Sequence, residues 1–162
     1  LSEITAEEHE VHHRWLDEAD IIRPTCRSER MGNLVVAIDT SGSIGGRVLT
    51  DFAAEVAKLA TLSEDTLILT CDAQVHQVIR TNAVPAFLAT LKFKGGGGTS
   101  HVPVFDWLKT HREVPDLLVA LTDLHSEYPD KKPPFPVLWC ATEKHGDPPP
   151  WGRVVVIPDT KD

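Results

Sequence analysis

The chain has 162 residues, of which 41% are hydrophobic and 25% charged, and its formal net charge is -8. These values suit one soluble globular domain, and no apolar run approaches the roughly 18 residues that a membrane span requires. The negative charge argues against nucleic-acid binding, which depends on clustered lysine and arginine, and it favours a cation site or a partner with a basic surface.

The first 30 residues are predicted to form a helix and a linker ahead of the domain, which spans residues 31–162. A helix from Thr5 to about Ala19 begins with a hydroxyl cap and has Glu8 three residues later. Pro24 and the charged residues that follow it then indicate a boundary.

From Leu34 onward, apolar runs typical of buried strands alternate with segments of helical period. The predicted strands are Leu34–Ile38, Thr66–Cys71, Gln74–Arg80, Leu117–Leu121, Pro136–Cys140 and Arg153–Ile157, and the predicted helices are Val48–Leu62, Val84–Leu91 and Val102–Thr110. The turn after Cys71 is too short for a parallel crossover and predicts an antiparallel edge hairpin. The pattern therefore predicts a doubly wound α/β fold, with a mostly parallel sheet, one antiparallel edge strand and helices on both faces.

Five oxygen-bearing side chains follow the two most apolar strands and a glycine run, namely Asp39, Ser41, Ser43, Thr99 and Asp123. In sheets of this kind, ligands bind beyond the carboxyl ends of the strands. If the strands that precede Asp39 and Asp123 are neighbours, both carboxylates reach one crevice. The set contains hard oxygen donors and no soft ligand, so it predicts a site for a divalent cation.

Mg²⁺ is the first candidate ion, with Mn²⁺ or Ca²⁺ as alternatives, because it prefers six oxygen ligands at about 2.0–2.1 Å. Two carboxylates would balance its charge, and three hydroxyls would add none. One position would stay open for a carboxylate from a partner protein. A simpler explanation also exists for each segment, because Asp39, Thr99 and Asp123 can each cap a turn or a helix.

This order of residues resembles the von Willebrand factor A (VWA) family from Leu34 to Ile157. The metal-ion-dependent adhesion site (MIDAS) of that family is an Asp-x-Ser-x-Ser loop, a distant threonine and a more distant aspartate. The resemblance implies a Rossmann-like fold, a metal site and cation-dependent protein–protein interaction rather than catalysis. The implied metal site consists of Asp39, Ser41, Ser43, Thr99 and Asp123. The family fold usually ends in a helix, which here is either missing or replaced by the N-terminal helix.

Further segments look similar to a bacterial VWA-like branch found C-terminal to a predicted metallopeptidase domain. They are Arg27–Arg30, Cys71–Ala73, Gly95–Thr99, Thr122–Leu124, Pro136–Trp139 and Trp151–Arg153. This resemblance implies a cytoplasmic, monomeric domain within a larger protein or complex. Members of the branch often carry an acidic residue after the threonine, where this chain has Ser100.

Two enzymatic alternatives stay open. The segment His9-Glu10-Val11-His12-His13 fits the His-Glu-x-x-His pattern of zinc peptidases, although a solvated charged helix also explains it and no third ligand is evident. A metal-dependent phosphohydrolase could use the five-residue site to activate water. Against it, no residue is placed as a general base or as a basic clamp for phosphate.

The remaining histidines and the cysteines give weaker signals. We expect His76, His101, His111, His125 and His145 to be surface residues, with His101 and His125 as candidates to approach the crevice and tune binding. The three cysteines show neither disulfide nor zinc spacing. We expect Cys71 and Cys140, at the ends of apolar runs, to be small buried hydrophobes in a protein of the reducing cytoplasm.

Overall fold

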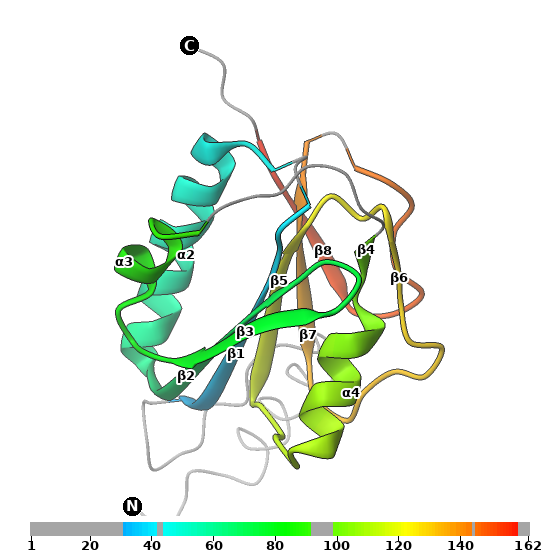
Figure 1. Cartoon of the computed structure of the whole chain (residues 1–162), viewed down its shortest axis with the longest axis horizontal. Coiled ribbons are helices and arrows are strands. Elements are labelled where there is room, and N and C mark those ends of the chain that lie inside the picture. The colour runs from blue at the N-terminus through cyan, green and yellow to red at the C-terminus, as the bar shows by residue number, and fades with distance from the viewer. Residues whose placement is uncertain (1–30, 42–43, 92–98, 144, 159–162) are drawn as a thin grey trace, which may run out of the picture.

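The computed structural model describes residues 31–41, 44–91, 99–143 and 145–158 (Figure 1). Several sequence-based predictions lie outside the described residues: the helix Thr5–Ala19, the linker up to residue 30 with Pro24 and Arg27–Arg30, the zinc-peptidase pattern His9–His13, the glycine run Gly95–Gly98 and Ser43.

A single six-stranded sheet, in the order β3-β2-β1-β5-β7-β8, forms the centre of the molecule (Figure 1). Its strands are β1 (Met31–Asp39), β2 (Ser63–Cys71), β3 (Val75–Arg80), β5 (Leu117–Thr122), β7 (Val137–Thr142) and β8 (Arg153–Ile157). Every neighbouring pair is parallel except β2 and β3, which are antiparallel. The predicted doubly wound sheet with one antiparallel edge strand is therefore confirmed.

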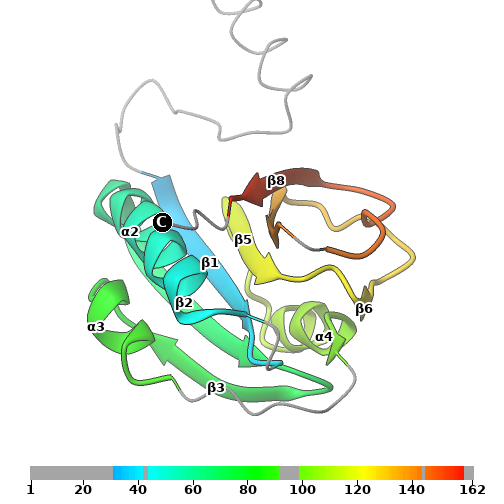
Figure 2. The same ribbon diagram turned by 90° about the horizontal axis from the view of Figure 1, so that it is seen from above.

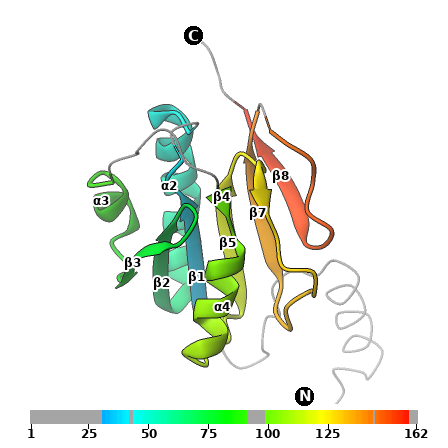
Figure 3. The ribbon, with the colours of Figure 1, turned by 45° about the vertical axis from the view of Figure 1, so that its right-hand side comes forward.

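Helices cover both faces of this sheet. They are α2 (Gly46–Leu62), α3 (Val84–Leu88) and α4 (Val102–Thr110). Figures 2 and 3 show α2 and α3 on one face and α4 on the other. Along β1, Val36 and Ile38 pack into the core on the α2 side, whereas Val35 and Ala37 pack into the core on the α4 side. Burial on both faces explains why the central strands are continuous apolar runs.

Besides shifts of one or two residues at other ends, some observed elements differ from the predicted ones. Both β1 and β2 begin three residues earlier than predicted, since the ladder continues through polar residues and pairs Met31 with Ser63. Helix α3 ends at Leu88 rather than Leu91. A second, two-stranded sheet of β4 (Thr99–Ser100) and β6 (Ser126–Glu127) was not predicted, because two residues carry no periodicity.

Strands β1 and β5 are neighbours, as the crevice prediction required. They pair in parallel, with Ile38 opposite Leu121, so Asp39 and Thr122 stand at the same edge of the sheet. The carboxyl ends of the parallel strands lie at the top in Figure 1. Residues that follow β1 and β5 are thereby brought together.

Both cysteines in the described residues behave as expected. Cys71 and Cys140 are buried, and burial raises the pKa of each thiol to about 12. A thiol with so high a pKa is inert near neutral pH, in keeping with a role as a small hydrophobe. None of the helices in the described residues has both the length and the apolar character needed to cross a bilayer.

Candidate metal centre

Asp39 is the most deeply buried member of the predicted site, with 0% of its surface exposed. Its Oδ1 accepts a hydrogen bond from the backbone N–H of Ser41 at 2.8 Å, which closes a tight turn after β1. Its Oδ2 is buried and has no hydrogen-bond partner among the described residues. One half of this carboxylate therefore serves the local turn, and the other half is left for a ligand.

Burial and several neighbouring groups shift the pKa of the Asp39 carboxyl group. Burial raises the pKa of its carboxyl group, and hydrogen bonds from the backbone and side chain of Ser41 oppose that shift. The charge of Asp123 raises the pKa further, and a hydrogen bond from Thr99 lowers it. Two carboxylates that destabilise each other's charge in a buried place are well suited to share a cation.

Thr99 reaches the acidic loop from the small second sheet. Its hydroxyl lies 3.5 Å from Asp39 Oδ1, at the long limit of a hydrogen bond. Strand β4 is fixed by its pairing with β6, which sets Thr99 opposite Ser126. The simpler explanation of Thr99 as a helix cap finds no support, because α4 is capped by His101 without a side-chain hydrogen bond.

The loop after Asp39 and the segment with Thr99 are both hydrogen-bonded to the carbonyl oxygens of the turn after β2, an arrangement that we call the main-chain clasp. The carbonyl oxygen of Cys71 accepts hydrogen bonds from the N–H and the hydroxyl of Thr40, at 2.8 and 3.1 Å. The next carbonyl oxygen, of Asp72, accepts one from the N–H of Ser100 at 2.9 Å. The turn after β2 thus ties the loop after Asp39 to the segment that carries Thr99.

Asp123 is held by a strained turn after β5. Leu124 is buried and has a φ of 59°, a left-handed conformation that is uncommon for a residue with a branched side chain. Its N–H donates to the hydroxyl of Thr122 at 3.0 Å, and its carbonyl accepts from the Tyr128 hydroxyl at 3.1 Å. These contacts offset the strain and fix the backbone next to Asp123.

Two further contacts orient the Asp123 turn. Asp123 Oδ1 accepts a hydrogen bond from the N–H of His125 at 2.9 Å, and its carbonyl accepts one from the N–H of Gly146, also at 2.9 Å. A Cβ on Gly146 would lie 2.6 Å from the carbonyl oxygen of Leu124, so this close approach requires glycine. Asp123 remains largely buried, with 6% of its surface exposed.

The prediction that His101 is a surface residue is wrong. It is fully buried, stacked on Tyr128 with ring centroids 5.9 Å apart and edge-on to Trp139 at 5.2 Å. Its Nδ1 lies 2.6 Å from the hydroxyl of Ser126, and its Nε2 has no hydrogen-bond partner among the described residues. Burial lowers the pKa of His101 to about 4, although the charge of Asp123 opposes that shift. His101 is therefore neutral at pH 7.

The other four predicted surface histidines are exposed, namely His76, His111, His125 and His145. The backbone N–H of His125 donates a hydrogen bond to Asp123 Oδ1, while its side chain is exposed. The burial of His101 comes from the pairing of β4 with β6 and from aromatic contacts distant in sequence, so no local pattern signalled it.

The structure brings four of the five predicted residues, Asp39, Ser41, Thr99 and Asp123, to one end of the sheet. No group of three or more His, Cys, Asp or Glu side chains suited to a metal ion occurs among the described residues. The candidate site instead combines two carboxylates with hydroxyls. The buried, unpartnered Asp39 Oδ2 and this set of hard oxygen donors fit a cation such as Mg²⁺.

Comparison with known protein families agrees with the fold. The model of a protein family described as "VWA-like domain (DUF2201)" matches residues 34–158, which is well over half of the chain. No curated protein matches the chain. The matched segment runs from β1 through β8 and includes both carboxylates. The chain belongs to the family of VWA-like domains.

Proposed function

We propose that this domain binds a protein partner through a divalent cation, in the manner of a MIDAS. The observation that carries the proposal is Asp39 Oδ2, which is buried and lacks a hydrogen-bond partner among the described residues. Leaving a buried carboxylate oxygen unsatisfied is costly, and the charge of Asp123 adds to that cost. A cation would offset both.

The residues proposed to hold the ion are Asp39, Ser41, Ser43, Thr99 and Asp123. Mg²⁺ is the preferred candidate, with Mn²⁺ and Ca²⁺ as alternatives. When bound, the ion would supply a positive centre able to accept a carboxylate oxygen from outside the chain. We propose that an acidic residue of the partner provides that oxygen, and that the domain works within a larger protein or complex.

Calorimetry tests the metal site directly. Mg²⁺ and Mn²⁺ would be titrated into EDTA-treated, dialysed chain as wild type, as Asp39→Ala and as Asp116→Ala. Asp116 is a matched control, because it is an exposed aspartate at the opposite end of the sheet. We expect binding heat from the wild type and Asp116→Ala and none from Asp39→Ala. Equal heats from the wild type and Asp39→Ala would reject the site.

A pull-down tests the partner. A protein retained in Mg²⁺, released by EDTA and not retained by Asp39→Ala would support cation-dependent interaction. The same preparations would be assayed for hydrolysis of a generic phosphoester. Metal-dependent turnover that Asp123→Ala abolishes would favour the phosphohydrolase instead, since that enzyme would use the same carboxylates.

A further inference from the structure

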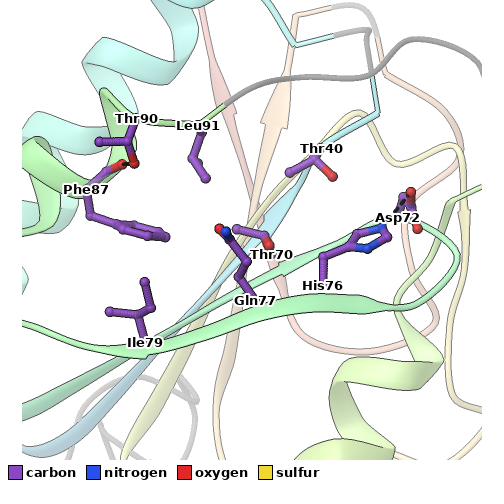
Figure 4. A pocket seen from close by; sticks show the side chains of 9 residues that line it. All are labelled: Thr40, Thr70, Asp72, His76, Gln77, Ile79, Phe87, Thr90 and Leu91. Atoms are coloured by element: carbon purple, nitrogen blue, oxygen red, sulfur yellow. Dashed lines mark hydrogen bonds and ion pairs between the residues drawn. The ribbon is translucent and has the colours of Figure 1, made fainter.

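A pocket of about 580 Å³ lies on the face of the sheet that α2 and α3 cover (Figure 4). Its volume falls within the range of about 300–1,000 Å³ that is typical of ligand sites. It lies between β3 and the end of α3, and Thr40 lines it. Because Thr40 directly follows Asp39, the pocket adjoins the acidic loop.

The lining of this pocket changes in character from one end to the other. At one end, Figure 4 shows the apolar side chains of Ile79, Phe87 and Leu91. At the other end lie Asp72 and His76, which form a pair at 2.8 Å. The described lining contains neither lysine nor arginine. The pocket therefore suits a side chain that is apolar along its stem and positively charged at its tip.

Between the two ends lie Thr70 and Gln77, which stand opposite each other in the register of β2 and β3. Thr70 is 2% exposed, and it lines the pocket beside Gln77. The hydroxyl of Thr70 and the amide of Gln77 can each accept a hydrogen bond from a ligand. The middle of the pocket therefore suits a polar group with hydrogen-bond donors.

The Asp72 carboxylate still has room for a donor. Its Oδ1 accepts from the N–H of Gln74 at 3.1 Å, and its Oδ2 faces His76 Nε2. An ionised carboxylate has about four lone-pair positions, and with the weaker contact from the Ala73 backbone about one stays open. Partial burial favours a higher pKa for Asp72, but hydrogen bonds from His76 and the Gln74 backbone outweigh it and lower the pKa. Asp72 is therefore anionic near neutral pH.

We infer that this pocket binds an arginine side chain of the partner protein. The arginine stem would pack against Phe87 and its neighbours, and its guanidinium would donate to Thr70, Gln77 and Asp72. The formal net charge of -8 favours a basic partner surface. The inference rests on the proposed function for the identity of the partner, since the same protein would bring its acidic residue to the adjoining cation.

The test uses N-acetyl-arginine amide as a probe, titrated into the ¹⁵N-labelled full chain in EDTA and followed by the amide signals of Thr70, Gln77 and Phe87. N-acetyl-citrulline amide has nearly the same shape without the charge. We expect saturable shifts with the arginine probe and affinity at least about tenfold weaker with citrulline, because a charge-assisted hydrogen bond is lost.

Two variants of equal charge change serve as a matched pair. Asp72→Asn should weaken the arginine probe about tenfold, whereas Asp130→Asn, an exposed site outside the pocket lining, should leave its affinity unchanged. Absence of shifts, equal binding of citrulline or indifference to Asp72→Asn would overturn the inference. Because the titration contains no free divalent cation, these outcomes are independent of the calorimetry on Asp39.

Discussion

At the amino ends of the strands, the Asp116 carboxylate accepts hydrogen bonds from the backbone N–H groups of Gly32 and Asn33, at 2.7 and 3.2 Å. At the carboxyl ends, Asp39 Oδ2 is buried and lacks a partner among the described residues. Both aspartates flank a central strand. Asp116 uses one carboxylate oxygen to hold β1 and β5 together, whereas Asp39 has one carboxylate oxygen without a hydrogen bond among the described residues.

Other polar groups show the same difference between the amino and carboxyl ends of the strands. At the start of β2, the hydroxyls of Ser63 and Thr66 lie 2.8 Å apart and satisfy each other in the core. At the opposite end, His101 Nε2 is buried without a partner among the residues described. Polar groups at the amino ends therefore stabilise the fold through mutual hydrogen bonds, while Asp39 Oδ2 and His101 Nε2 at the carboxyl ends lack a partner among the described residues.

The largest expected effect is a pH-dependent loss of unfolding free energy caused by His101. Because burial lowers its pKa from 6.5 to about 4, the unfolded state binds a proton first as the pH falls. Stability from this group is full above pH 6.5 and is lost between pH 6.5 and about 4, by about 3 kcal/mol. Urea unfolding in EDTA at several pH values would measure this loss. His101→Phe, which cannot titrate, should lack it, and an identical pH profile in both proteins would contradict the prediction.

Replacing glycine by alanine at Gly146 and at Gly32 compares the carboxyl and amino ends of the strands. A Cβ would lie 2.6 Å from the Leu124 carbonyl oxygen at Gly146 and 2.5 Å from Asp116 Oδ2 at Gly32. We expect Gly146→Ala to cost about 2 kcal/mol by overpacking against backbone, and Gly32→Ala to cost less, because the end of the Asp116 side chain can move. Only Gly146→Ala, which displaces the backbone beside Asp123, should also weaken Mg²⁺ binding, by about tenfold. Unfolding curves and calorimetry on both variants measure the two effects, and equal loss of Mg²⁺ affinity would remove the distinction between the ends.

The two aspartates should respond to asparagine with opposite signs. In EDTA at pH 7, Asp39→Asn removes a buried charge that Asp123 opposes, so we expect stability to rise by about 1 kcal/mol. Asp116→Asn loses the charge assistance of two hydrogen bonds, so we expect a loss of about 1 kcal/mol. Chemical denaturation of both variants is the measurement. A loss of stability in both would mean that Asp39 is as structural as Asp116.

The smallest expected effect is at the surface of the amino end. Arg80 pairs with Asp65 and Glu113 and so links β3 to β2 and to the segment after α4. These side chains are partly exposed, so we expect Arg80→Gln to cost about 0.5 kcal/mol. The cost should shrink in about 1 M salt, where charges are screened within about 3 Å. A larger cost that salt does not change would point to packing of the arginine stem instead.

The sequence predicted the parts of this fold that depend on local pattern. The apolar runs of β1 and β5 indicated strands buried on both faces, and the turn after Cys71 was too short for anything but an antiparallel neighbour. The crevice rule predicted Asp39 and Asp123 at one edge of the sheet if β1 and β5 are neighbours, as they are.

Features that arise from contacts between distant segments could not be predicted. The pairing of Thr99 with Ser126 involves two residues on each side and has no period to detect. The left-handed conformation of Leu124 is unusual for leucine and depends on partners such as Tyr128. The pocket beside Thr40 combines residues from β2, β3 and α3 that are distant in sequence, so no single local pattern predicts it.

The main-chain clasp after β2 has a consequence for how this domain can diversify. The acceptors at residues 71 and 72 are main-chain carbonyl oxygens, so any residue type at these two positions supplies them. Alanine at either position would keep both acceptors. The side chain of residue 72 can therefore vary while the main-chain hydrogen bonds between the acidic loop, the turn after β2 and the segment with Thr99 keep their acceptors.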